Sequence, residues 1–354
     1  MKTGVVAVHL GAGNHSRKKE AAYRRLAEKA CNIAISKLKE GSTATEAAAL
    51  AVKVLEESSL TNAGRGSNLT LDGRVECDAG VCSGTGRGAG IGALNGVRNP
   101  ILVAEKLLSE SFETLSLGRV SPLLLVGEGA LQFAREQRLE LATDEEMTTH
   151  ESAVKFTKWS DMLADSIEPD STEDTINDTV GAVCVDLHGQ VASAASSGGV
   201  ALKRRGRVGV AAIVGAGFWA GHDNAGNSVA VCTSGTGEDI LSIGLARECG
   251  RELLRDLLDD SPDGKLDPIV MALSSCSASE AVQQQPLAAG ALSVAVEASG
   301  VAQVQYAHTT HSMALAVHTT CWPAPHSLLS RASTTSRYKA LQPSAAVVGA
   351  FHVS

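Results

Sequence analysis

Short, uninterrupted apolar runs alternate with segments of helical spacing in the first half of this chain. The first run covers residues 5–8, and its continuous apolar character predicts a strand buried on both faces. Apolar residues then recur with helical spacing as far as Leu38, and Gly41 ends this pattern. A capping box predicts a further helix start at Thr43. Two turn sequences predict helix starts at Asn99 and Val126.

In the second half, strand-like runs are separated by short turns. A β-branched run begins at Thr179, turns at residues 187–190 and returns over residues 191–199, which predicts an antiparallel hairpin. That pairing would bring Ser197 back beside Thr179, so that two hydroxyl groups would meet. Further strands are predicted over residues 228–232, 291–296, 301–307 and 313–318.

Two segments have no regular pattern along their length. Residues 143–178 are rich in Asp, Glu, Ser and Thr, and only their middle has helical spacing. We predict a flexible, acidic linker here, which ends at the strand that begins with Thr179. The Pro/Ser/Ala-rich tail from about residue 319 is left unassigned.

The composition indicates a globular protein and excludes several functional classes. Hydrophobic residues make up 44% of the 354 residues and charged residues 20%, with a net charge of −8. This charge gives no basic surface for nucleic acid or an anionic membrane, and no apolar run approaches the roughly 20 residues of a membrane helix. No signal region follows Met1, and the eight cysteines have no zinc-site spacing. We therefore expect reduced thiols and an intracellular protein of the cytoplasm, the nucleus or both.

A glycine-dense stretch between residues 80 and 96 loosely resembles a nucleotide-binding motif. Residues 84–89 match part of a dinucleotide fingerprint, but they do not open a helix within a βαβ unit. We reject that interpretation. The sequence contains no Walker A motif.

The start of the central strand carries the candidate nucleophile. If the bond between Asp178 and Thr179 is cut, Thr179 becomes an N-terminus with a hydroxyl and an amine on one residue. An α-amine has a pKa of about 7.7–8.0, so much of it is neutral near pH 8 and can accept a proton. The alternative is a strand that merely begins with threonine.

A glycine-containing turn at Ser234 and Gly235 exposes backbone N–H groups suited to an oxyanion, although an ordinary strand-to-helix turn has the same pattern.

Six motifs appear in the order that is typical of one enzyme family. They are His9-Leu10-Gly11-Ala12-Gly13, Thr61-Asn62-Ala63-Gly64, Asp178-Thr179-Val180-Gly181-Ala182, Ser196-Ser197-Gly198-Gly199, Gly206-Arg207-Val208-Gly209 and Ser234-Gly235-Thr236-Gly237-Glu238. On these motifs the chain resembles the Thr-type N-terminal-nucleophile hydrolases of the asparaginase-2 group over roughly residues 4–250. Within the group it looks most like the threonine aspartase (taspase) branch, whose members cut proteins after aspartate.

Three residues favour this branch. Asp178 precedes the nucleophile where asparaginases typically have Gly, and Ser197 stands where they have Thr. Val210 follows the Arg-Val-Gly motif where asparaginases have an Asp that holds the free α-amine of the substrate. An internal peptide has no such amine and needs no counter-ion.

The resemblance implies an α/β (α+β) fold, a four-layer αββα sandwich. It also implies self-cleavage into an α subunit (1–178) and a β subunit (179–354), which together form one composite domain. These subunits would form an αβ heterodimer or a dimer of it. The implied partners are protein substrates with an internal Asp, and neither a metal nor an organic cofactor is required.

The resemblance also assigns roles to individual residues. Thr179 would attack the carbonyl after a substrate Asp, with the Ser197 hydroxyl beside it. Gly11 and Asn62 would position Thr179. The turn at Ser234 and Gly235 would donate hydrogen bonds to the oxyanion. The planar fork of Arg207 would bind the substrate carboxylate. Lys19 would aid self-cleavage or bind acidic substrates; the alternative is a solvated lysine.

Two other functions remain open. The first is an asparaginase, isoaspartyl peptidase or glycosylasparaginase that uses the same nucleophile on small substrates, against which Val210 argues. The second is an unprocessed pseudoenzyme that acts as a binding protein, which the unassigned tail keeps open.

Overall fold

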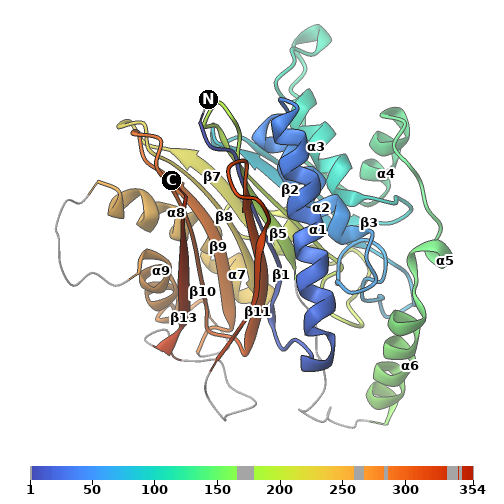
Figure 1. The fold of residues 1–354 in the computed structure, drawn as a ribbon. Coiled ribbons are helices and arrows are strands. Elements are labelled where there is room, and N and C mark those ends of the chain that lie inside the picture. Colours follow the sequence, from blue (N-terminus) through green and yellow to red (C-terminus); the bar gives the residue numbers. More distant parts are fainter. Residues whose placement is uncertain are drawn as a thin grey trace.

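Two β-sheets lie face to face in the computed structural model, and helices cover the outer face of each sheet (Figure 1). The structure describes residues 2–165, 179–258, 267–282, 286–332, 342 and 345–353. The four layers are the predicted αββα sandwich, and the prediction of this fold is confirmed.

The larger sheet has eight strands, and the predicted hairpin after Thr179 lies at its centre. In spatial order its strands are β12 (His326–Arg331), β11 (Ser312–Thr319), β1 (Val5–Gly13), β5 (Val180–Val185), β6 (Val191–Ser197), β2 (Cys77–Ser83), β3 (Gly88–Leu94) and β4 (Leu124–Val126). All neighbours are antiparallel except β3 and β4.

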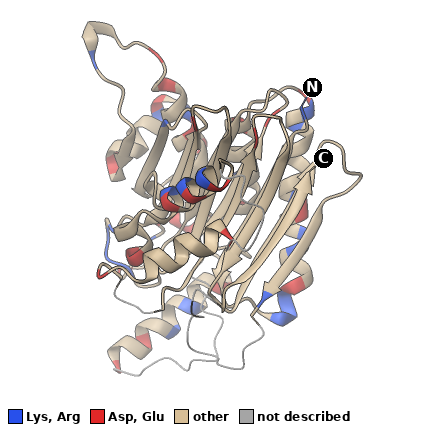
Figure 2. Cartoon of the chain, turned by 90° about the vertical axis from the view of Figure 1, so that its left-hand side faces the viewer, with Lys and Arg blue, Asp and Glu red and all other residues tan. Residues whose placement is uncertain are grey.

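The second sheet has five antiparallel strands and includes those predicted over residues 228–232, 291–296 and 301–307. Their order is β13 (Val347–Val353), β10 (Ala302–His308), β9 (Ala289–Val296), β8 (Ser228–Gly235) and β7 (Phe218–His222). Charged residues lie mainly on the helices and loops around the sheets, and the strands carry few of them (Figure 2). This distribution fits strands that are covered on both faces.

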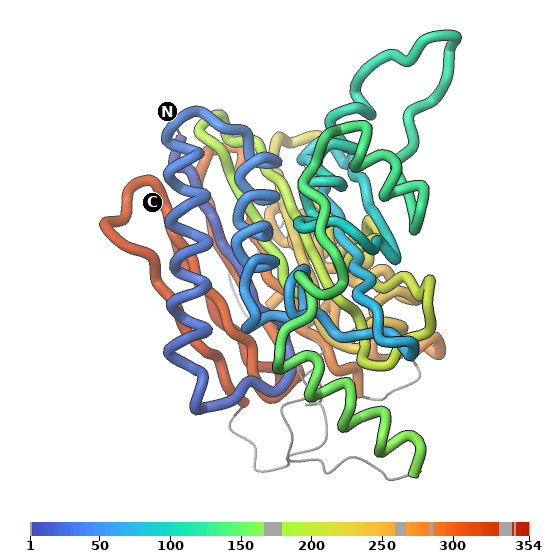
Figure 3. The backbone as a smooth tube through the Cα atoms, turned by 90° about the vertical axis from the view of Figure 1, so that its right-hand side faces the viewer, coloured from blue at the N-terminus to red at the C-terminus, as the bar shows by residue number. Residues whose placement is uncertain are grey.

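Three long helices cover most of the larger sheet, and α4 (Gly127–Glu136) packs on β3 and β4 at one edge. Helix α1 (Glu20–Lys39) packs on β1 and β11, α2 (Ala44–Glu56) packs on β5 and β6, and α3 (Pro100–Glu110) packs on β2 and β3. Helices α1 and α2 lie side by side in the tube view (Figure 3). The predicted capping box is present at the start of α2, where Thr43 and Glu46 exchange hydrogen bonds.

The remaining helices lie on the second sheet or at the periphery. Helix α8 (Leu245–Asp256) packs on β7 and β8, and α9 (Pro268–Ser277) packs on α8 and β10. Shorter or peripheral elements are α4 (Gly127–Glu136), α5 (Asp144–Met147), α6 (His150–Ala164), α7 (Gly237–Ile243) and the 3-10 turns η1 (Arg17–Lys19), η2 (Ser116–Gly118) and η3 (Val210–Ala212). No helix among the described residues is long and apolar enough to cross a membrane.

Two segments are more regular than the sequence pattern predicts. Residues 143–165, expected to belong to a flexible linker, contain α5 and α6, and capping boxes at Thr143 and Thr149 begin these helices. The sequence showed helical spacing only in the middle of this segment, because few residues of α6 are buried. The rest of the expected linker, residues 166–178, lies outside the described residues. The unassigned tail contains β12 and β13, each of which forms one edge of a sheet.

The glycine-dense stretch forms the hairpin of β2 and β3, on which the neighbouring layer sits directly. A Cβ atom on Gly90 would lie 1.9 Å from the carbonyl oxygen of Ala212 in η3. A Cβ on Gly80 would lie 2.1 Å from the ring of Phe218, and one on Gly92 would lie 2.8 Å from Val208. These glycines are therefore required for close approach between layers.

The Gly90→Ala substitution tests this close packing. The added methyl group must displace the backbone of η3, and overpacking of this kind costs about 1–3 kcal/mol of unfolding free energy. Urea denaturation should show that loss. The matched control is Gly129→Ala in α4, where nothing lies within 4 Å of the new Cβ and the change should be neutral or stabilising by up to about 1 kcal/mol. Equal stability of both variants would contradict the packing account.

Candidate active site

The register of β5 and β6 brings the two predicted hydroxyl residues together. Val180 pairs with Ser196, so the next facing pair is Thr179 and Ser197. Both residues are buried, with exposures of 4% and 3%. Asp178, the other residue of the proposed cleavage bond, lies outside the described residues.

Asn62 holds the turn that follows Ser197. Its side-chain amide donates to the carbonyl oxygen of Gly199 at 2.8 Å, and its own carbonyl accepts the N–H of Gly198 at 2.7 Å. The side-chain oxygen of Asn62 accepts the N–H of Asn68 at 2.8 Å. The Ser197 Oγ accepts the N–H of Gly199 at 2.9 Å. Asn62 therefore acts on the turn that carries Ser197.

Gly11 lies in the irregular C-terminal end of β1, beside the start of the neighbouring strand β5. Gly11 has a φ of +109°, and its N–H donates to Nδ1 of His9 at 3.2 Å. Burial lowers the pKa of His9 to about 3, so this imidazole is neutral and can accept at Nδ1. The N–H of Ala12 donates to the Ser234 Oγ at 3.1 Å. The Ser234 hydroxyl thus joins β8 of the second sheet to β1.

The turn after Ser234 has a conformation that only glycine fits. Gly235 has a φ of +143°, and a Cβ atom there would lie 2.2 Å from the carbonyl oxygen of Ala288. The same oxygen accepts the N–H of Thr236 at 2.8 Å. The backbone of this turn is therefore held in one position.

The guanidinium of Arg207 lies between the two glycine turns. Its Nη1 lies 2.8 Å from the position of a Cβ on Gly199, and its Nη2 lies 3.0 Å from the position of a Cβ on Gly237. Glu238 Oε1 accepts from Nε at 2.9 Å and from Nη2 at 2.6 Å. The Arg207 side chain is 18% exposed and the Glu238 side chain 61%. Arg207 is thus paired with an exposed carboxylate of the same chain.

Asp78 holds the loop that carries Arg207, and the sequence analysis missed it. Asp78 pairs with Ser197 in the register of β2 and β6 and is fully buried. Its carboxylate accepts the N–H groups of Ala93 and Gly209, both at 2.8 Å. Burial raises the pKa of Asp78, against the lowering effects of nearby cations and these hydrogen bonds. A charged residue within a glycine-rich apolar strand was the available signal.

A second pair of residues missed by the sequence analysis supports the same loop. Glu76 is buried and accepts the N–H of Gly206 at 2.8 Å. Lys203 is also buried, and its ammonium donates to the carbonyl oxygens of Glu76 and Gly198, the latter at 2.7 Å. Lys203 thus ties the loop to the Ser197 turn and does not form part of a solvated basic surface.

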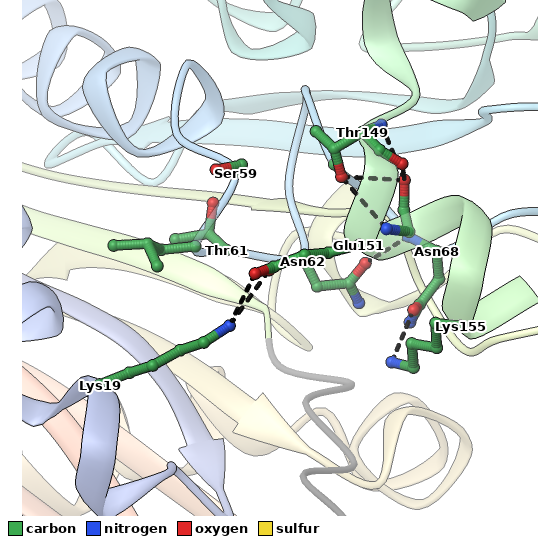
Figure 4. Close-up of a pocket in the computed structure, with 11 residues that line it drawn as sticks. Lys19, Ser59, Thr61, Asn62, Asn68, Thr149, Glu151 and Lys155 are labelled. Atoms are coloured by element: carbon green, nitrogen blue, oxygen red, sulfur yellow. Dashed lines mark hydrogen bonds and ion pairs between the residues drawn. The ribbon is translucent and has the colours of Figure 1, made fainter.

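Lys19 lies apart from these groups, at a small cavity of about 130 Å³ that Asn62 also lines (Figure 4). Its ammonium pairs with Glu151 of α6 at 3.1 Å, and both side chains are substantially exposed. Lys155 donates to the Asn68 side chain at 2.8 Å across the same cavity. These contacts pair Lys19 with Glu151 and not with Arg207, and its role in self-cleavage or in binding acidic substrates stays a prediction.

The described residues hold no cluster of three or more His, Cys, Asp or Glu that fits a metal ion. All eight cysteines are free thiols, and all but Cys321 are buried.

Comparison with known proteins identifies the family. The sequence model of the asparaginase family, described as Asparaginase, matches residues 2–258. An isoaspartyl peptidase/L-asparaginase of Xenopus laevis is 35% identical over 244 residues, covering 69% of this chain and 74% of the relative. A plant-type L-asparaginase of Pyrococcus horikoshii is 36% identical over 257 residues (68% and 77%), and an isoaspartyl peptidase of Escherichia coli is 34% identical over 247 residues (67% and 73%). With its sandwich fold and these matches, the chain belongs to the asparaginase-2 family of N-terminal-nucleophile hydrolases.

Proposed function

We propose that this protein is a self-processing threonine endopeptidase that cuts protein substrates after aspartate. The observation that carries the proposal is the surroundings of Arg207. Its guanidinium lies between the Ser197 turn and the Gly235 turn, and the neighbouring Val210 is apolar and buried. A substrate carboxylate could bind the arginine there, whereas a free α-amine would meet no carboxylate at position 210.

The chemistry begins with cleavage of the bond before Thr179, which frees its α-amine. The Thr179 hydroxyl then attacks the carbonyl carbon of the substrate Asp, and the amine accepts the hydroxyl proton. We assign the stabilisation of the oxyanion to the turn at Ser234 and Gly235, with the Gly235 N–H as its backbone donor, because the Thr236 N–H already donates to Ala288. Proton return to the leaving amine gives an ester on Thr179. Water hydrolyses this ester and regenerates the hydroxyl.

Asp specificity follows from the geometry of the arginine. A guanidinium can bind a carboxylate through two parallel hydrogen bonds, which an asparagine amide cannot match. Because Glu238 occupies this fork in the substrate-free chain, the substrate must displace it. The asparagine side chain would gain too little from the arginine to do so.

The second candidate is an asparaginase or isoaspartyl peptidase of small substrates, and the names of the relatives favour it. Those substrates carry a free α-amine beside an α-carboxylate. Val210 is the specific point against this candidate, because the resemblance places an Asp at that position in the enzymes that bind the amine.

Substrate comparison separates the two candidates. Processed protein should cut a peptide with an internal Asp and leave the otherwise identical Asn peptide intact, while turning over L-asparagine and β-aspartyl dipeptides at least about 100-fold less efficiently. Mass spectrometry of the products gives the cleavage site. Efficient turnover of the small substrates without peptide cleavage would refute the endopeptidase and establish the second candidate.

The Glu238→Gln variant tests the competition for Arg207. Exposed ion pairs contribute about 0.2–1 kcal/mol, so loss of the competing charge should lower KM for Asp peptides by roughly 1.5- to 5-fold and leave kcat unchanged. Steady-state kinetics measures both constants. The matched control is Glu248→Gln on α8, which removes a surface ion pair with Arg251 and should change neither. A raised KM in Glu238→Gln would show that Glu238 assists binding.

The Val210→Asp variant tests the selectivity assigned to this position. A carboxylate beside Arg207 should raise turnover of β-aspartyl dipeptides at least about tenfold and weaken cleavage of Asp peptides by a similar factor through repulsion. Val210→Asn is the control of equal shape without the charge. Identical substrate preferences in the Asp and Asn variants, both checked for folding by thermal denaturation, would remove this role from position 210.

A further inference from the structure

Glu56 is a buried acid that the proposed mechanism does not use. It is the last residue of α2, and its side chain is fully buried between α2, α3 and the larger sheet. Its Oε1 accepts from the Ser196 hydroxyl at 2.6 Å and from the N–H of Ile101 at 3.0 Å. The Asn99 amide donates to Oε2 at 3.4 Å. One carboxyl group thus joins a helix end, the start of α3 and the end of β6.

The backbone of Glu56 also supports the loop that contains Asn62. Its carbonyl oxygen accepts the N–H of Arg65 at 2.8 Å. Gly64 has a φ of +59°, and a Cβ atom there would lie 2.6 Å from the Cβ of Glu56. The loop therefore folds tightly around this residue.

These contacts reach the candidate active site from two directions. Ser196 precedes Ser197 in β6, and because side chains alternate along a strand, a bond to Ser196 from the helix layer fixes Ser197 toward the opposite sheet. Asn62, on the loop around Glu56, holds Gly198 and Gly199 by hydrogen bonds. The side chain of Glu56 thus supports the Ser197 turn through Ser196, and its backbone carbonyl supports the same turn through the loop that contains Asn62.

We infer that Glu56 is a positioning residue whose carboxyl group holds the Ser197 hydroxyl in register with Thr179. The inference rests on the proposed function, because it assigns Ser197 a place beside the nucleophile. Glu56 does not touch the reacting atoms. Its effect is geometric, and small displacements near a reacting centre are costly: about 1 Å can lower a rate about 100-fold.

The protonation state of Glu56 suggests the conservative variant. Burial raises the pKa of Glu56 to about 8, against the lowering effects of its hydrogen bonds, so the neutral acid predominates at pH 7. A glutamine is neutral and of the same shape, and its oxygen can still accept from Ser196 and Ile101. Glu56→Gln should therefore preserve the positioning, whereas Glu56→Ala removes it.

Asp186 provides a matched control at the opposite end of the same β5–β6 hairpin. It is also a buried carboxylate, and it accepts N–H groups from His188 at 2.9 Å, Gln190 at 3.0 Å and Ala44 at 3.1 Å. Asp186→Asn weakens the hairpin without touching the Ser197 turn. It separates loss of stability from loss of positioning.

The kinetic test compares Glu56→Ala, Glu56→Gln, Ser196→Ala and Asp186→Asn as processed enzymes. Glu56→Ala should lower kcat at least about 30-fold with KM within about threefold, and Ser196→Ala should lower kcat about 3- to 10-fold. The kcat of Glu56→Gln should stay within about threefold of the wild-type value. Asp186→Asn should lose thermal stability, and its kcat should stay within about twofold of the wild-type value. Equal kcat losses in Glu56→Ala and Asp186→Asn would overturn the inference.

Hydrogen exchange tests the same inference without any substrate. In Glu56→Ala, the amides of residues 196–199 should exchange at least about tenfold faster, and Asp186→Asn should leave them unchanged. If Glu56→Ala does not fold, Ser196→Ala should show the change within residues 196–199. Unchanged protection there in the folded variants would overturn the positioning role. An inactive wild-type enzyme would instead refute the proposed function, and hydrogen exchange would still decide the role of Glu56.

Discussion

The pairing of β5 with β6 determines which side chains can meet at the candidate site. Side chains alternate between the faces of a strand, so the pair of Val180 and Ser196 places Ser196 against Glu56 and Ser197 on the other face beside Thr179. A slip of one residue would exchange these two serines between the faces. Interactions on both sides of β6 oppose such a slip, because β2 pairs with it and the end of α2 bonds to it.

Glycine has a structural role at this site that differs from its role in a nucleotide-binding motif. The glycines of β2 and β3 allow Val208 and η3 to lie directly on the strand backbones. This contact, with the hydrogen bond from Gly209 to Asp78, fixes the loop that carries Arg207. The fork of Arg207 can then lie between two other glycine turns. Its position therefore depends on close packing of layers as well as on charge.

Local patterns predicted much of the fold but only part of the site. Uninterrupted apolar runs and a capping box identified most of the central strands and α2, because these signals are local in the chain. Helix α6 was recognised only as helical spacing in the middle of the expected linker, and edge strands β12 and β13 were missed, since these elements bury few side chains and their pattern is weak. Sequence alone gave no sign that Glu56, Glu76 and Lys203 lose contact with water, whereas the apolar, glycine-rich surroundings of Asp78 in the chain were a sign of its burial. Their burial depends on segments distant in the chain. The family followed from ordered motifs, and the choice of activity within it depends on a few positions around Arg207.

The central claim is that cleavage before Thr179 creates the nucleophile, and intact mass measurement of purified protein tests it most directly. Wild-type chain incubated near pH 8 should convert into two fragments with the masses of residues 1–178 and 179–354. The Thr179→Ala chain, which differs by one side chain at the sheet end, should keep its full mass. A wild-type chain that stays intact after long incubation, or a Thr179→Ala chain that is cut at the same bond, would contradict the account.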